Sequence, residues 1–209
     1  HGIDREAQEA FAIESQARAT TARESGSFAD EIVPIETTDG MVEEDGCIRS
    51  GTDSAALGKL RPAFDANGTV TAGTSSPLTD GAAFVFVCSE EFAAEHGLAP
   101  MARIVSAAVS GCAPEIMGIG PVSASRKALE RAGLTLDDID LIELNEAFAA
   151  QSLAVIGELG LDKDKVNIEG GAIALGHPLG ASGARITGKA AQLMQKNGAE
   201  HALATLCVG

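Results

Sequence analysis

The sequence of 209 residues predicts an α/β fold, in which helices cover a mostly buried sheet. Apolar segments of strand length alternate along most of the chain with helical segments of about ten to fifteen residues. Hydrophobic residues make up 45% of the sequence, which is enough for one sizeable core or two modest ones. Trp and Tyr are absent and only seven Phe are present, so the core must be aliphatic.

The elements follow from local patterns. Asp4 can cap a helix that runs to about Glu24, and Gly26 ends it. An irregular polar stretch at 36–68 is too long for a simple connection and is expected to form a surface lobe with a function. The expected strands cover residues 31–35, 82–89, 102–111, 165–171 and 201–209, and residues 134–145 are expected to form an acidic turn followed by a buried strand. The expected helices after the first cover residues 89–96, 121–132, 146–160 and 182–197.

Composition excludes several classes of protein. A net charge of -15 argues against nucleic acid or an anionic membrane as the principal partner. No run approaches 18 apolar residues, so no membrane span is expected. The four cysteines show no CxxC spacing, which disfavours a metal site or a disulfide framework and favours a cytoplasmic location. The chain starts within a helix signature and stops after a buried strand, so we expect it to be part of a longer protein.

The segment "LIELNEAFAAQ" at 141–151 delivers Asn145 and Glu146 to the carboxyl end of an apolar strand. In open α/β sheets, ligands bind at that edge. The alternative is structural, with Asn145 as a helix N-cap and Glu146 as a residue of the first helical turn.

The glycine-rich segment "GGAIALGHPLGASGAR" at 170–185 fits neither a dinucleotide fingerprint nor a Walker loop. Pro178 disfavours a helical conformation at His177, and the neighbouring glycines let a ligand approach the imidazole closely. We therefore interpret the segment as a rigid seat for a catalytic histidine, although a lone histidine is usually structural. Cys207 ends the last strand and is either functional or a small buried hydrophobe.

Together the contexts "NEAF", "GHP" and "CVG" resemble the C-terminal half of a thiolase, an acyl-CoA acyltransferase. The segments "EIVPI", "LGKLRPAF", "VTAGTSSPLTDGAA" and "MGIGP" match the same family. The resemblance implies a thiolase-like layered α-β-α fold that is incomplete. Residues 1–68 would form part of the loop domain over coenzyme A, 69–97 the closing segment of the N-terminal domain, and 98–209 the C-terminal domain without its final strand.

The resemblance also implies roles for the site residues. His177 would deprotonate a nucleophilic cysteine and help to hold the thioester oxygen, and Cys207 would be the second acid/base. Asn145 would orient a water that donates to the oxyanion, and the backbone N–H of Gly209 would serve a second oxyanion hole. The nucleophile of the family lies upstream of His1, and none of the other three cysteines stands in its context. The chain alone is therefore expected to be inactive and to expose an apolar surface that its other half covers.

Binding residues follow from the same resemblance. Ser76 would contact the pantetheine amide, and Met117 and Phe148 would line the acyl-pantetheine pocket. The basic residues of the irregular stretch would contact the nucleotide phosphates, namely Arg49, Lys59 and Arg61. Coenzyme A thioesters are the expected substrates, with no cofactor and no metal, and the complete protein is expected to be a homodimer or homotetramer.

Several functions stay open. "GTSSPLTDG" favours thiolytic cleavage of 3-ketoacyl-CoA, as in fatty-acid β-oxidation, over biosynthetic condensation of two acetyl-CoA. A ketoacyl synthase is disfavoured because that class uses a second histidine where this chain has Asn145. A non-catalytic coenzyme A-binding relative would not need Asn145, His177 and Cys207 together. An NAD-dependent oxidoreductase would need the glycine segment to bind a dinucleotide.

Overall fold

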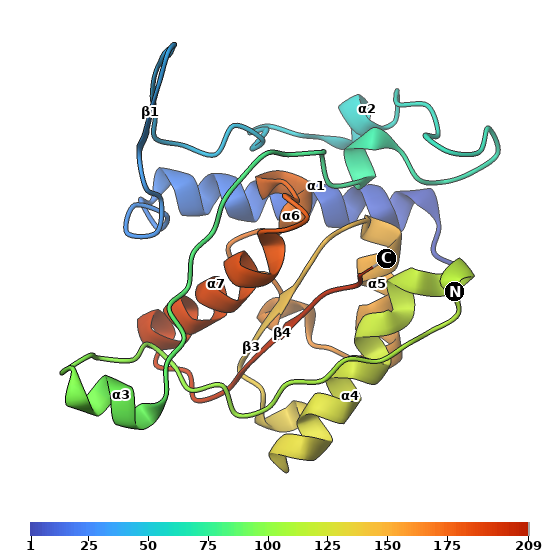
Figure 1. The fold of residues 1–209 in the computed structure, drawn as a ribbon. Helices are drawn as coiled ribbons and strands as arrows, with labels where there is room; N and C mark the ends of the chain where they lie inside the picture. Colours follow the sequence, from blue (N-terminus) through green and yellow to red (C-terminus); the bar gives the residue numbers. More distant parts are fainter. Residues whose placement is uncertain (209) are drawn as a thin grey trace. The chain divides into compact units, whose positions relative to one another are not determined.

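The computed structural model describes residues 1–208, which Figure 1 draws as a ribbon. These residues divide into two compact units. The first unit comprises His1–Leu78, Glu146–Leu153 and Ile168–His177. The second comprises Thr79–Asn145, Ala154–Asn167 and Pro178–Gly209.

Helix α1, Arg5–Glu24, is the longest element of the first unit and begins where the sequence predicts. The Asp4 side chain accepts a hydrogen bond of 2.8 Å from the Ala7 N–H, which satisfies one of the free donors at the helix start. The helix ends at its cap Ser25, and Gly26 follows with a φ of 75° that favours glycine.

The core of the first unit forms where α1 packs against three short helices, α2 (Ser54–Leu57), η1 (Ala72–Thr74) and α6 (Ala172–Leu175). Ala12, Leu57, Ala149 and Ile173 form its buried centre. The chain approaches α1 closely just before α6. A Cβ on Gly170 would lie 2.6 Å from the Cβ of Ala19 on α1, so the small size of both residues allows this contact.

The irregular stretch contains a small hairpin of β1 (Ile35–Thr37) and β2 (Gly40–Val42), which pair antiparallel with Ile35 opposite Val42. The strand predicted over 31–35 therefore starts only at Ile35. All six strand residues are exposed, so this hairpin has no buried face of its own.

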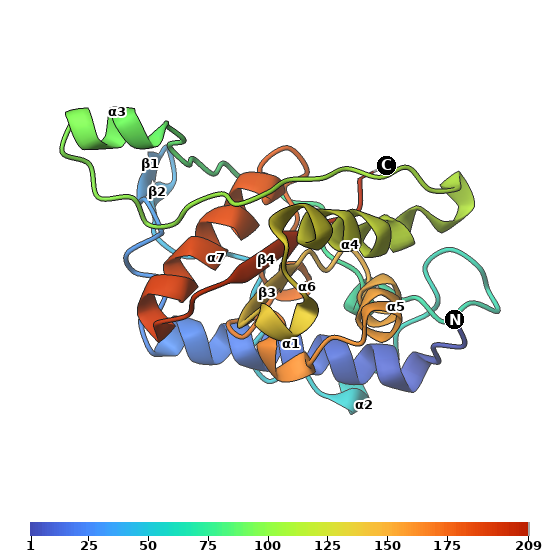
Figure 2. The same ribbon diagram turned by 90° about the horizontal axis from the view of Figure 1, so that it is seen from below.

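The second unit is built on a parallel pair, β3 (Leu141–Leu144) and β4 (Ala202–Thr205), in which Leu144 lies beside Thr205. Helix α7, Ser182–Asn197, packs on both strands, and α4, Gly120–Ala132, packs on β4 (Figure 2). Both helices match their predicted ranges closely. Gly133 and Gly198 end them in the left-handed conformation typical of helix C-termini.

Shorter elements complete the fold. Helix α3 covers Glu90–Glu95 and is capped by Ser89, within the predicted range. Three turns of 3-10 helix follow, η2 (Pro114–Ile119), η3 (Leu136–Asp138) and η4 (Lys163–Lys165). Helix α5 covers Ala149–Leu159 and starts three residues later than predicted.

Three predicted strands are wrong for the described residues. Segments 82–89 and 102–111 form no strand, and their large apolar side chains, such as those of Phe84 and Val109, are exposed. A strand needs a neighbour for its backbone hydrogen bonds, and no described segment pairs with these two. Segment 165–171 makes only an isolated bridge between Val166 and Ile142.

Candidate active site

Asn145 lies directly after β3 and is fully buried. Its backbone N–H donates a hydrogen bond of 3.0 Å to the Thr205 carbonyl oxygen, which continues the parallel pairing by one residue. Because α5 begins only at Ala149, Asn145 does not cap that helix. The capping interpretation is therefore wrong, and the burial of this amide needs another explanation.

Cys207 follows β4 by two residues and is 7% exposed. Parallel strands end at the same edge of a sheet, so Asn145 and Cys207 leave β3 and β4 on one side of the same unit. Burial raises the pKa of the Cys207 thiol above its ordinary value, because desolvation disfavours the thiolate. Its own backbone N–H opposes that rise, and the nearby Cys112 adds to it. Cys207 therefore holds its proton at neutral pH.

The end of β4 is fixed from a second side by α4. The buried Ser125 hydroxyl lies 3.1 Å from the Thr205 hydroxyl and donates to it. Thr205 thus joins α4 through its side chain and Asn145 through its carbonyl oxygen. This arrangement holds the strand end that precedes Cys207.

His177 belongs to the first unit, where its backbone forms a parallel bridge with Leu78. The bridge is consistent with the extended conformation that Pro178 imposes. Gly176 caps α6 with a φ of 95°, a conformation that a side chain would disfavour. The glycine segment therefore contains the four-residue helix α6, and the chain turns at Gly176 immediately before His177.

Glu146 of the first unit precedes α5, so its interpretation as a residue of the first turn of that helix is wrong. Its carboxylate is buried, and the residue is 1% exposed. The carboxylate accepts hydrogen bonds of 2.6 Å from the Ser15 hydroxyl and 3.1 Å from the Ile173 N–H. The Gly171 N–H in turn donates to the Ser15 hydroxyl oxygen over 3.1 Å. A Cβ on Gly171 would collide with the Glu146 carboxylate, so glycine is required there. No spacing in the sequence pointed to Ser15.

The proposed binding residues lie in both units. In the first, the Ser76 hydroxyl and backbone N–H both donate to the Ala147 carbonyl oxygen over 3.1 Å. The ring of Phe148 meets that of Phe64 edge to face, with centroids 5.9 Å apart. Met117 is half-buried in η2 of the second unit, and Gly209 lies outside the described residues.

The three basic residues of the irregular stretch are exposed on the first unit, and none is in an ion pair among the described side chains. The guanidinium of Arg5 donates to the carbonyl oxygens of Leu57 and Leu60 over 2.9 and 2.8 Å. These bonds anchor the backbone of residues 57–60 to α1, and Lys59 and Arg61 lie in or next to this anchored segment. The exposed side chains of Lys59 and Arg61 are therefore available to an anionic ligand.

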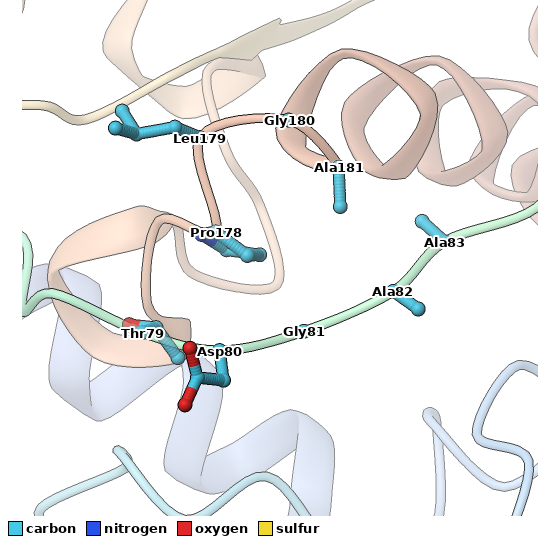
Figure 3. Close-up of a pocket in the computed structure, with 9 residues that line it drawn as sticks. All are labelled: Thr79, Asp80, Gly81, Ala82, Ala83, Pro178, Leu179, Gly180 and Ala181. Atoms are coloured by element: carbon cyan, nitrogen blue, oxygen red, sulfur yellow. The ribbon is translucent and has the colours of Figure 1, made fainter.

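An open pocket of about 390 Å³ lies within the second unit between residues 79–83 and 178–181 (Figure 3). Small residues make up most of its lining, and Asp80 contributes the only charged side chain among the nine lining residues. A carboxylate repels phosphate, so this face of the glycine segment does not suit a phosphate group. Gly81 lies so close to Pro178 that a Cβ there would stand 3.0 Å from the ring.

The part of the chain that the structure describes contains no group of three His, Cys, Asp or Glu residues that could hold a metal ion. No helix among residues 1–208 has both the length and the apolar character needed to cross a membrane.

Comparison with known proteins gives consistent matches. The family model described as "Thiolase, N-terminal domain" matches residues 1–91, and "Thiolase, C-terminal domain" matches residues 98–209. The chain is 53% identical to an acetyl-CoA acetyltransferase of Chromobacterium violaceum and 56% identical to a 3-ketoacyl-CoA thiolase of Cronobacter sakazakii. These alignments cover all of this chain but only 55% and 56% of the two relatives.

A solved structure of human mitochondrial 3-ketoacyl-CoA thiolase in complex with CoA is 45% identical and superposes with a TM-score of 0.94. The match covers all of this chain and 53% of the human one. The chain therefore spans about half the length of the relatives and has the thiolase fold over that span.

Proposed function

Because this chain belongs to the thiolase family, we propose that it forms part of an enzyme that transfers an acyl group between a cysteine thioester and coenzyme A. The reaction that its residues favour is thiolytic cleavage of a 3-ketoacyl-CoA. The observation that carries the proposal is the backbone hydrogen bond between Asn145 and Thr205, because it lines up the carboxyl ends of β3 and β4, which Asn145 of "NEAF" and Cys207 of "CVG" follow.

The raised pKa of Cys207 suits the first half of this reaction. When a nucleophilic cysteine attacks the 3-keto carbon, the bond between the second and third carbons breaks and leaves the enolate of acetyl-CoA. A protonated Cys207 can donate its proton to the α-carbon of that enolate, which yields acetyl-CoA and a Cys207 thiolate.

The second half returns the proton. The Cys207 thiolate, disfavoured by burial, is a good base for the thiol of incoming coenzyme A. The coenzyme A sulfur then attacks the acyl-cysteine, the bond to the enzyme breaks, and a shortened acyl-CoA leaves. His177 would first deprotonate the nucleophilic cysteine and then help to hold the thioester oxygen.

We assign stabilisation of the negatively charged oxygens to Asn145, His177 and Gly209. Asn145 would hold a water that donates to the enolate oxygen, and His177 would be a second donor to that oxygen. Losing one such donor commonly lowers the rate by about 10²–10³. The backbone N–H of Gly209 would serve the second oxyanion hole.

For coenzyme A itself, we propose that Ser76, Met117 and Phe148 contact the pantetheine arm. Arg49, Lys59 and Arg61 would lie near the phosphates. These three basic residues would allow an acidic chain to bind an anionic substrate, because a local basic site is enough to attract the phosphates. A relative solved in complex with CoA supports this substrate class.

The nucleophile is proposed to lie outside these 209 residues, since Cys47, Cys88 and Cys112 stand in no matching context. Large apolar side chains are exposed in segments 82–89 and 102–111. Their exposure supports a second half of the enzyme outside this chain, because that half would supply strand neighbours for both segments. The assembled enzyme is proposed to be a cytoplasmic homodimer or homotetramer. The isolated chain is then expected to show no turnover of acetoacetyl-CoA, and measurable turnover free of full-length contaminant would contradict this.

A biosynthetic acetoacetyl-CoA thiolase is the second candidate, since one relative is named acetyl-CoA acetyltransferase. Thiolysis rates of the full-length gene product on short and long 3-ketoacyl-CoA separate the two. A preference for chains longer than acetoacetyl-CoA supports the degradative enzyme, and restriction to acetoacetyl-CoA supports the biosynthetic one. Coenzyme A binding without either reaction would favour a non-catalytic relative.

A further inference from the structure

Asn167 in the second unit differs from all other described residues that are not glycine, because it alone has a positive φ, 47°. It is 3% exposed and lies in the segment predicted as a strand. Its backbone N–H donates to the Ile142 carbonyl oxygen over 2.8 Å. A left-handed conformation at a buried residue costs free energy, so the surrounding structure must favour it.

The Asn167 side chain makes two hydrogen bonds to a single residue, Leu144. Its Oδ1 accepts from the Leu144 N–H over 2.9 Å, and its Nδ2 donates to the Leu144 carbonyl oxygen over 2.8 Å. An amide side chain carries one donor and one acceptor side by side, as a peptide group does. Asn167 thus takes the place of a neighbouring strand at the free edge of β3.

Leu144 is the residue immediately before Asn145. Its two backbone groups bond to Asn167 on one edge of β3, and the N–H of Asn145 bonds to Thr205 on the other. The backbone that carries the Asn145 amide is therefore held from both sides. Without the Asn167 side chain, Leu144 would lose both of these hydrogen bonds, while the bond from Asn145 to Thr205 would remain.

We propose that Asn167 is a positioning residue for Asn145. This inference rests on the proposed function, and it adds a residue that touches neither the substrate nor the reacting atoms. Displacing a catalytic group by about 1 Å can lower a rate about 10²-fold. Loss of the amide clamp on Leu144 should therefore lower kcat while leaving the affinity for coenzyme A unchanged.

The decisive variants are made in the full-length gene product. Asn167→Gly keeps the positive φ without strain and removes both side-chain hydrogen bonds. Asn167→Asp keeps the acceptor but sets a carboxylate oxygen against the Leu144 carbonyl oxygen. Asn197→Gly is the matched control, because the Asn197 amide donates one hydrogen bond of 2.9 Å to the Leu193 carbonyl oxygen at the end of α7.

The expected result is a fall in kcat of about ten- to hundredfold for Asn167→Gly with KM for coenzyme A unchanged, and wild-type kcat for Asn197→Gly. Relative to wild type, the kcat of Asn167→Asp should recover as the pH falls. A protonated carboxyl group again offers one donor and one acceptor, and this buried carboxyl should protonate readily. Asn167→Gly should show no such recovery, which separates positioning from a general loss of stability.

Wild-type kcat in Asn167→Gly would overturn the proposal, as would a change in KM alone or a fall in Asn167→Asp without recovery at low pH. If Asn167→Gly fails to fold, the pH profile of Asn167→Asp decides. A wild-type protein that does not cleave 3-ketoacyl-CoA would instead overturn the proposed function. In that case, hydrogen exchange of the Leu144 and Asn145 amides still tests the clamp, because Asn167→Gly should speed both.

Discussion

The hydroxyl of Ser15 donates a hydrogen bond of 2.6 Å to the buried carboxylate of Glu146, 131 positions further along the chain. This contact ties α1 to the residue that follows Asn145. The same carboxylate accepts from Ile173 at the start of α6, the helix that leads to His177. One buried group therefore fixes two segments of the first unit that continue into proposed catalytic residues.

Replacing Gly171 with alanine should destabilise the chain, because the new Cβ would collide with the Glu146 carboxylate. Overpacking of this kind typically costs about 1–3 kcal/mol. Urea denaturation of wild type and Gly171→Ala measures the difference in unfolding free energy.

Gly157→Ala is the control for that experiment, because Gly157 lies within α5 and a Cβ there would meet nothing within 4 Å. Alanine should stabilise this helix by about 0.5–1 kcal/mol. Equal effects of the two substitutions would mean that the packing of Gly171 on Glu146 does not limit stability.

Removing the Ser15 hydroxyl should also destabilise the first unit, since Glu146 loses a short hydrogen bond in a buried place. The expected cost of Ser15→Ala is about 1–3 kcal/mol, the usual range when a buried polar group loses its partner. Ser123→Ala provides the comparison, because its hydroxyl bonds to that of Ser110 on the exposed surface. An unfolding free energy equal to that of Ser123→Ala would contradict the role given to Ser15.

Alkylation of the cysteines tests the protonation state of Cys207. Only the thiolate reacts with iodoacetamide, and burial raises the pKa of Cys207. At pH 7.5 its labelling should be slower than that of the exposed Cys88, and it should accelerate only above the ordinary thiol pKa of about 8.5. Peptide mapping by mass spectrometry follows each cysteine separately. Faster labelling of Cys207 than of Cys88 at pH 7.5 would refute the protonated thiol.

Charge removal at Lys59 and Arg61 should weaken binding of coenzyme A to the full-length gene product. Each exposed contact is worth up to about 1 kcal/mol, so the double alanine variant should bind roughly tenfold more weakly. The difference should shrink at high salt, because ions screen exposed charges. Calorimetric titration measures it, and Lys127→Ala on α4 should bind as wild type does. Unchanged affinity in the double variant would exclude these residues as phosphate contacts.

Local signals predicted much of the fold. The Asp4 cap, the glycines after α4 and α7, and the apolar strand before Asn145 fix those elements within a residue or two. Segments 82–89 and 102–111 have strand composition, but a strand also requires a neighbour, which local composition does not report.

In the candidate site, too, local signals identify some residues and miss others. The motif residues Asn145, His177 and Cys207 stand out in the sequence, each beside a strand or a glycine. Ser15 and Asn167 could not be found that way, since they act through contacts with Glu146 and Leu144 that are distant in sequence. Asn167 even lies in a segment of strand composition, although asparagine is among the few non-glycine residue types that readily take a positive φ.

The most direct test of the central claim is acylation of the full-length gene product by 3-ketoacyl-CoA, followed by mass spectrometry of the intact protein. The His177→Ala variant should form no acyl-enzyme, because the nucleophilic cysteine would keep its proton. Asn145→Ala and Cys207→Ala should lower turnover by at least about 10². Wild-type acylation and turnover in the His177→Ala variant would contradict the acyl-transfer mechanism proposed for this chain.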